Sequence, residues 1–238
     1  MPCLIAVLAV LLVLSPAQAQ TTLEASVGGA SLLLPVPDGF TEPSISAPIL
    51  RTNAEAITAP PMRLIAVFVD EEDRRAVERG TPPSFRRYFM VQVLRARESE
   101  TLDESSFLNV KSQVTGLNRE AFMRVSDELR KHVDSAAMKI GTEAGVGELA
   151  LDIGRPRQLG LFHETDSSVS TMLVTRASAS TSTRTIERTV AQATSTILLK
   201  GKVVFFTAYS EVNGGSDYDW LRGVSRVWVE SARQANRQ

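Results

Sequence analysis

Residues 197–209 read Ile-Leu-Leu-Lys-Gly-Lys-Val-Val-Phe-Phe-Thr-Ala-Tyr, and this pattern predicts a β-hairpin. The β-branched and aromatic side chains on both sides of Lys200-Gly201 favour strands, and glycine supplies the positive φ that a two-residue turn requires. Near the start of the chain, residues 23–27 and 30–34 flank Gly28-Gly29 in the same way. Hairpins at both ends predict a sheet that is mainly antiparallel.

The middle of the chain predicts helices and further strands. Apolar residues at helical spacing indicate helices, and short continuous β-branched runs indicate strands. The expected helices are 48–57, 70–79 with Asp70 as its cap, 102–114 and 117–138, and the expected strands are 64–69, 88–94, 159–162 and 168–175. We expect residues 64–69 to form a central strand that is covered on both faces, because this run is continuously apolar.

Two segments between these elements have distinctive compositions. Residues 141–157 contain four glycines and a proline, which predicts a flexible loop. Residues 181–196 are rich in Ser and Thr. That composition leaves two alternatives open, an exposed pair of strands or disorder.

The end of the chain predicts an amphipathic helix that begins at Ser216, whose hydroxyl would cap it together with Asp219. The expected buried face comprises Trp220, Leu221, Val224, Val227, Trp228 and Ala232. All the elements together predict an α+β domain. Its central sheet is mainly antiparallel, has hairpins at both ends and is flanked by helices, and the C-terminal helix packs on the sheet.

The first residues have the features of a secretory leader. Residues 3–14 are an apolar run of signal-peptide length, shorter than the about 20 residues of a membrane helix. Ser15-Pro16 then breaks the run, and Ala17-Gln18-Ala19 provides the small residues that signal peptidase accepts. We expect a signal peptide over 1–19, cleaved after Ala19, and one α+β domain over 20–238. No Lys or Arg precedes the run, and an uncleaved anchor is the alternative.

Charge and cysteine content restrict the partners. The chain carries 26 Lys and Arg against 27 Asp and Glu, so no basic surface for nucleic acid or for an anionic membrane is expected. Its single cysteine, Cys3, would leave with the leader. A mature chain without thiols forms no disulfide, Cys-ligated metal site or cysteine nucleophile. This pattern favours a periplasmic or secreted bacterial protein without stable membrane insertion after cleavage.

Histidines offer the main candidates for catalysis. His163 stands in His163-Glu164-Thr165-Asp166, which groups three possible proton-transfer groups or ligands after a predicted strand. The spacing matches no helical zinc motif, and a polar turn explains it more simply. His132 is expected on the solvated face of its helix. We therefore assign no catalytic, cofactor or metal residue, and we keep a hydrolase that uses His163 with Glu164 or Asp166 as the alternative.

Three other segments have partial motifs. Residues 213–219 carry oxygen ligands on alternate positions, but they lack the full calcium-loop pattern, and helix capping accounts for them. Residues 70–73 are acidic, as is usual for a solvated first helical turn. Residues 145–150 fit Gly-x-Gly-x-x-Ala, the dinucleotide fingerprint, but they follow a predicted helix where the motif requires a strand.

A family resemblance follows from the order of the elements. The exported start, the hairpin that leads into Leu34-Pro35-Val36-Pro37-Asp38-Gly39-Phe40, the Lys200-Gly201 hairpin and the Trp-containing last helix resemble PsbP-like α/β domains. The resemblance implies a binding or assembly factor without a shared active site. We therefore predict an exported, non-enzymatic binding or assembly protein whose partner, another protein or a small molecule, is unknown.

Overall fold

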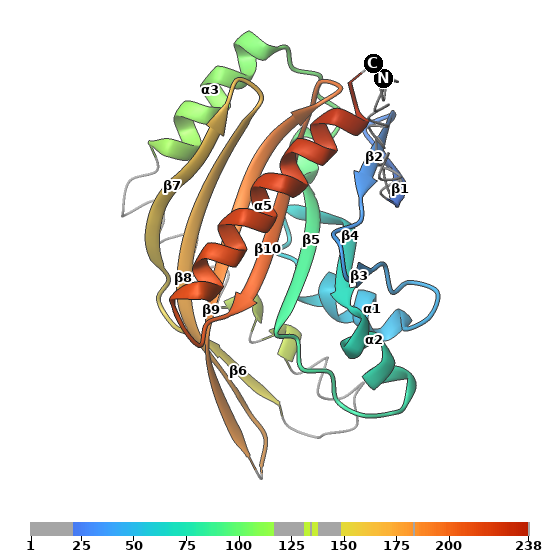
Figure 1. The fold of residues 1–238 in the computed structure, drawn as a ribbon, viewed down its shortest axis with the longest axis vertical. Coiled ribbons are helices and arrows are strands. Elements are labelled where there is room, and N and C mark those ends of the chain that lie inside the picture. The colour runs from blue at the N-terminus through green and yellow to red at the C-terminus, as the bar shows by residue number, and fades with distance from the viewer. Residues whose placement is uncertain (1–20, 117–130, 134, 138–148, 183, 238) are drawn as a thin grey trace, which may run out of the picture.

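The computed structural model describes residues 21–116, 131–133, 135–137, 149–182 and 184–237. Its main sheet has eight strands in the order β3-β4-β5-β10-β9-β8-β6, with β7 paired to β8, and every pair of neighbours is antiparallel (Figure 1). A second sheet contains β1 and β2. Helices lie against the main sheet. This architecture confirms the predicted α+β fold class.

The strands are β1 (Thr22–Val27), β2 (Ala30–Pro35), β3 (Phe40–Thr41), β4 (Met62–Asp70), β5 (Arg87–Leu94), β6 (Ala150–Ile153), β7 (Arg157–Thr165), β8 (Ser168–Ser180), β9 (Thr185–Leu199) and β10 (Lys202–Glu211). The helices are α1 (Pro48–Ile57), α2 (Glu71–Glu78), α3 (Glu104–Thr115) and α5 (Gly215–Ala235). A short 3-10 turn covers Arg95–Arg97.

Both predicted hairpins are confirmed. The turn between β9 and β10 has Lys200 at φ 47° and Gly201 at φ 76°, and the turn between β1 and β2 has Gly28 at φ 51° and Gly29 at φ 82°. Two successive positive φ angles match the right-handed twist of the flanking strands. In each hairpin, the residues that flank the turn pair directly.

The position predicted for residues 64–69 was wrong in one respect. β4 is buried on both faces as predicted, because Ala66 and Phe68 face one core cluster while Val67 and Val69 face the other. It nevertheless lies next to the two-residue edge strand β3, and β10 and β9 occupy the centre of the sheet. Helices α1 and α2 account for the burial near this edge, since both contact β4.

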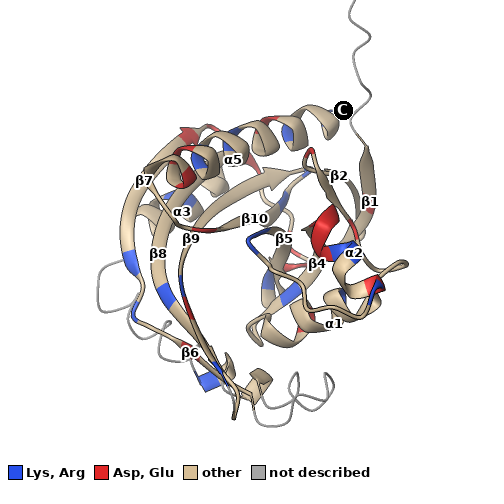
Figure 2. Cartoon of the chain, turned by 60° about the horizontal axis from the view of Figure 1, so that its bottom comes forward, with Lys and Arg blue, Asp and Glu red and all other residues tan. Residues whose placement is uncertain are grey.

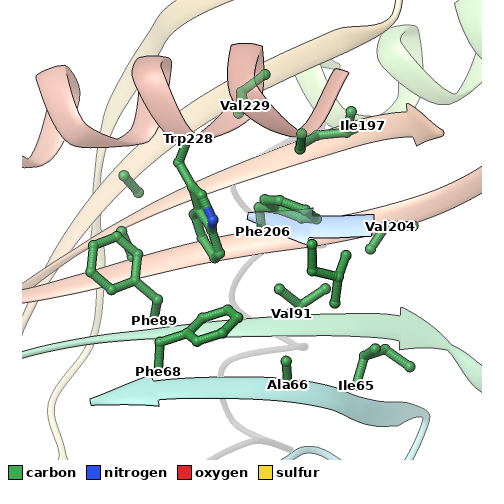
Figure 3. Close-up of a cluster of buried hydrophobic side chains, with 14 of the residues drawn as sticks. Ile65, Ala66, Phe68, Phe89, Val91, Ile197, Val204, Phe206, Trp228 and Val229 are labelled. Carbon is green, nitrogen blue, oxygen red and sulfur yellow. The ribbon is translucent and has the colours of Figure 1, made fainter. Parts of the chain in front are cut away.

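Helix α5 covers the other face of the sheet and contacts β9, β10 and β2 (Figure 1). Trp228 is the centre of an aromatic cluster, with ring centroids 4.9 Å from Phe89, 4.5 Å from Phe206 and 6.0 Å from Phe68 (Figure 3). Its indole nitrogen donates to the Pro35 carbonyl at 2.7 Å. Trp228 therefore joins the main sheet to the β1–β2 hairpin.

Two predictions for the last helix were wrong. Gly214 is the N-cap, and the Asp217 carboxylate accepts from the backbone N–H groups of Asn213 at 2.9 Å and Gly214 at 3.1 Å. Asp219 instead pairs with Arg222 at 3.1 Å. Val227, predicted to be buried, is 64% exposed, whereas Leu221, Trp228 and Ala232 are buried as predicted.

Several boundaries also differ from prediction. The predicted loop over 141–157 contains β6, which pairs with the far end of β8. Residues 185–199 form the long strand β9, so the described part of the Ser- and Thr-rich segment is not disordered. The predicted helix over 117–138 lies largely outside the described residues, although 131–133 and 135–137 are helical. Among the described residues, no helix has the length and apolar character needed to span a membrane.

Candidate functional site

The structure separates the side chains of the His163 segment. His163 faces α5, and its Nε2 lies 3.7 Å from Glu230 Oε1. The next residue, Glu164, instead forms an ion pair with Lys111 of α3, with 2.8 Å between Oε1 and Nζ. Neighbouring residues of a strand point to opposite faces of the sheet. Asp166 is exposed in the turn between β7 and β8. His163 and Glu164 therefore do not converge on one reaction centre.

The hydroxyl groups near His163 are buried. Ser170 pairs with His163 across β7 and β8, and its Oγ lies 2.7 Å from Ser195 Oγ. Both serines are 1% exposed, so a substrate cannot reach either oxygen. This geometry does not favour a hydrolase that uses His163.

The other histidine also differs from prediction. His132 was expected on a solvated surface, yet it is half-buried, and its enclosed Nε2 has no hydrogen-bond partner among the described residues. No group of three or more His, Cys, Asp or Glu that could hold a metal occurs among the described residues.

The acidic segments have local structural roles. Asp70 caps α2 by accepting from the Glu72 N–H at 2.7 Å. Asp73 is 2% exposed, and it accepts from the N–H groups of Ser84 at 2.5 Å and Phe85 at 3.0 Å. Residues 213–219 cap α5, but through Gly214 and the carboxylate of Asp217 and not through the predicted Ser216. Residues 145–148 of the Gly-x-Gly-x-x-Ala segment lie outside the described residues.

A hollow of about 380 Å³ lies beside the first half of α5, and we call it the α5 hollow. Three parts of the chain form it: the turn between β2 and β3, the adjacent ends of β4 and β5, and one flank of α5. The lining residues are Pro37, Asp38, Gly39, Phe40, Asp70, Arg87, Trp220, Val224, Val227 and Trp228.

Local sequence determines the wall formed by the turn. Phe40 N–H donates to the Pro37 carbonyl at 3.0 Å, and Gly39 takes φ 81° at the second corner. A residue at that corner needs a positive φ, which glycine adopts without strain. The Phe40 ring then packs edge-on against Phe89, with a centroid distance of 4.6 Å. This contact fixes the turn to the core.

The end of the sheet supplies the polar groups of the hollow. Phe68 and Phe89 on the α5 face are fully buried, and Asp70 and Arg87 stand two residues further along the same strands. Alternation in a strand therefore directs Asp70 and Arg87 toward the same face, just outside the aromatic core. The structure places both at the hollow.

Arg87 is held in place by two groups of α5. Its guanidinium carbon lies 3.9 Å from the centre of the Trp220 ring, and its Nη2 lies 3.2 Å from Asp217 Oδ1. The pKa of Asp217 is lowered, chiefly because its carboxylate accepts from the Asn213 N–H, and further by Gly214 and Arg87. The carboxylate therefore stays ionised and offsets the charge of Arg87.

The hollow was not predicted from the sequence, although the spacing of the apolar residues in α5 indicates it. At about 100° per residue, Leu221, Trp228 and Ala232 centre one stripe on α5, and Trp220, Val224 and Val227 form a second stripe beside it. With Val229, which is also buried, the two stripes cover an arc of about 200°, whereas an apolar stripe of about 100° is enough for a helix to face a core. An apolar arc of that width indicates a flank that remains available.

A second hollow, of about 450 Å³, lies at the other end of α5, next to Lys200-Gly201 and the start of α3. Three of its polar side chains bind within the protein. Asn236 contacts the Leu33 backbone, Arg233 pairs with Glu230 at 2.9 Å, and Lys200 donates to the Ser31 carbonyl at 3.1 Å. This hollow has no exposed large apolar side chain in its lining.

Comparison with known proteins assigns no family. No family model matches the chain, and no curated protein matches it. Among solved structures, the chain is similar to the Ran-binding protein Mog1p of Saccharomyces cerevisiae, with 15% identity, a TM-score of 0.30, and coverage of 92% of this chain and 93% of that chain. A likeness at that score supports no inference about function.

Proposed function

We propose that this protein is an exported, non-enzymatic binding or assembly protein that holds a partner at the α5 hollow. The observation that carries the proposal is the second apolar stripe of α5. Val227 is 64% exposed, and Trp220 and Val224 are only half-buried, all beside one hollow. Scattered surface apolar residues are normal, but a contiguous patch beside a concavity marks a binding site.

The hydrolase alternative has less support. Ser170 and Ser195, the serines across the sheet from His163, are buried, and Glu164 lies on the other face of the sheet. The resemblance to PsbP-like domains remains a prediction from element order. It agrees with a binding role and supplies no site residues of its own.

Site-specific photo-crosslinking in living cells tests the proposed partner site. A photoreactive amino acid at Val227 should form an adduct of defined mass with one partner. The matched control is Leu108 of α3, another exposed helical apolar residue at 56% exposure. The proposal fails if position 227 forms no adduct, or if position 108 gives the same adducts.

Export can be tested separately. If the leader is cleaved after Ala19, the exported chain begins at Gln20 and has lost Cys3, the single cysteine of the sequence. The denatured exported protein should then show an N-terminus at Gln20 and no reaction with a maleimide reagent. A maleimide-reactive chain that retains Met1 would establish the uncleaved anchor instead.

A further inference from the structure

The charges at the α5 hollow do not balance. Its lining contains Asp38, Asp70 and Arg87, and the charge of Arg87 is offset by Asp217 at 3.2 Å. Among the described residues, no Lys or Arg lies within ion-pair distance of Asp38 or Asp70. One oxygen of Asp70 accepts from the Glu72 N–H at the start of α2. Two negative charges therefore stand at the rim.

The start of α2 adds to this negative field. Asp70 is followed by Glu71, Glu72 and Asp73, which appear as the red first turn of α2 in Figure 2. Glu71 is neutralised by Arg74 and Arg75, and Asp73 is buried, but Glu72 is exposed. The side of the hollow formed by the turn after β2 and the end of β4 thus carries the carboxylates of Asp38 and Asp70, and the side formed by α5 is apolar.

The apolar surface continues beyond the hollow. Trp220, Val224 and Val227 all line the hollow, and Val227 keeps most of its surface in solvent. The apolar surface of α5 therefore extends from the hollow into solvent. A polypeptide segment that crosses α5 can cover Val227 and also fill the hollow.

We infer that the occupant of the α5 hollow is a segment of a partner protein that inserts one aliphatic side chain against Trp220 and Val224 and sets Lys or Arg opposite Asp38 and Asp70. This inference rests on the proposed function, because it names the chemistry of the partner at the same site. Complementary charges would fix the orientation of the segment, and the apolar contact would supply most of the binding free energy.

Binding of short peptides to the mature chain tests the inference. The probe is acetyl-Lys-Leu-Lys-amide, and the matched control is acetyl-Glu-Leu-Glu-amide. The chain has two tryptophans, so two indole N–H signals are expected in a ¹⁵N spectrum, and a Trp220→Phe variant assigns them. The basic peptide should shift the Trp220 signal in a saturable way, and added salt should weaken the effect. The acidic peptide should cause no saturable shift.

Variants that remove charge test whether binding of the basic peptide depends on the carboxylates of Asp38 and Asp70. Asn caps helices as well as Asp does, so Asp38→Asn with Asp70→Asn removes both charges and retains the cap of α2. We expect the dissociation constant of the basic peptide to rise about fivefold or more. Asp166→Asn, an exposed carboxylate in the turn between β7 and β8, is the control and should leave binding unchanged.

Four results would overturn the inference. The first three are equal binding of the acidic and basic peptides, unchanged binding of the basic peptide to the double variant, and failure of the basic peptide to shift the Trp220 signal. The fourth is binding of leucinamide as tightly as the tripeptide, which would indicate a small-molecule site. A crosslinked partner at position 227 together with any of these results would leave the proposed function standing and refute only the inference about the chemistry of the occupant.

Discussion

Trp228 shows how one side chain positions the site. It packs among Phe68, Phe89 and Phe206, and its indole donates to the Pro35 carbonyl at 2.7 Å. Trp220, two turns earlier on α5, is half-buried and stacks with Arg87. Both tryptophans line the hollow, but Trp228 is buried and anchors the helix, whereas Trp220 keeps part of its surface exposed.

Replacement of these tryptophans should separate the two roles. Trp228→Phe removes the hydrogen bond and leaves a cavity in the core, so we expect the free energy of unfolding to fall by about 2–4 kcal/mol. Trp220→Phe should cost under about 1 kcal/mol, as is usual away from the core. Urea denaturation of both variants measures the difference. Equal losses of unfolding free energy would show that Trp228 contributes no more to stability than Trp220 does.

Glu98 gives a pH-dependent contribution at the residue scale. Arg63 Nε donates to its carboxylate at 2.8 Å, and the Gly28 N–H donates at 3.3 Å. The pKa of Glu98 is lowered, first by the hydrogen bond from Arg63 and then by Gly28 and nearby positive charge. A carboxylate with a lowered folded pKa stabilises the fold above its unfolded pKa of about 4.3, and this stabilisation is lost as the pH falls through the folded value.

Glu98→Gln should therefore be destabilising at neutral pH only. We expect a loss of about 1 kcal/mol at pH 7, which shrinks as the pH falls, because protonated Glu98 resembles glutamine. The measurement is denaturant unfolding of both proteins at pH 7 and at the lowest pH at which both still fold. If the two proteins differ in unfolding free energy by the same amount at both pH values, the ion pair between Arg63 and Glu98 does not provide the stabilisation assigned to it.

The β1–β2 hairpin illustrates what an element needs beyond its own sequence. Both turn glycines have positive φ, but their surroundings differ. A Cβ added at Gly28 would lie 1.9 Å from the Glu98 carbonyl oxygen, whereas one added at Gly29 would meet nothing within 4 Å. Gly28 therefore permits close packing of the hairpin on the chain near Glu98, and Gly29 serves the turn alone.

Alanine substitutions at the two positions should differ clearly. Gly29→Ala should cost about 1–2 kcal/mol from backbone strain. Gly28→Ala adds a steric clash with the backbone and should cost about 3 kcal/mol or more. Thermal unfolding of the two variants makes the comparison. Equal melting temperatures would mean that the hairpin does not pack on Glu98 in this way.

Elements with local signals could be predicted from the sequence. Glycine turns, the Asp70 cap and the apolar spacing of 48–57 specify nearby structure, and the structure reproduces them. The order of strands could not be predicted, because the pairing of β5 with β10 depends on contacts between distant residues. Strand β6 was missed because its four residues have weak propensity and are stabilised by pairing with β8.

The α5 hollow is a property of the whole molecule. It needs the turn after β2, the ends of β4 and β5, and α5, which are far apart in sequence. Sequence reasoning identified Trp220, Val224 and Val227 as apolar but placed them in the core. Only the packing of α5 shows that Trp220 and Val224 contact the core with part of their surface and that Val227 stays exposed.

The core holds the walls of the hollow together. Phe40 packs on Phe89 at 4.6 Å, and Phe89 packs on Trp220 at 6.2 Å. The turn, the sheet and the helix are therefore linked through one buried ring. A site built on packed elements is preorganised, which reduces the entropic cost of binding.

The central claim is that the walls of the hollow contact one partner. The most direct test places a photoreactive amino acid at Asp38 on the turn and, separately, at Val224 on α5, each with and without Val227→Glu. We predict that both probes form an adduct with the same polypeptide in cells and that Val227→Glu removes both adducts, while Leu108→Glu leaves them intact. Absence of an adduct from either probe, adducts with different polypeptides, or adducts that persist with Val227→Glu would contradict the claim.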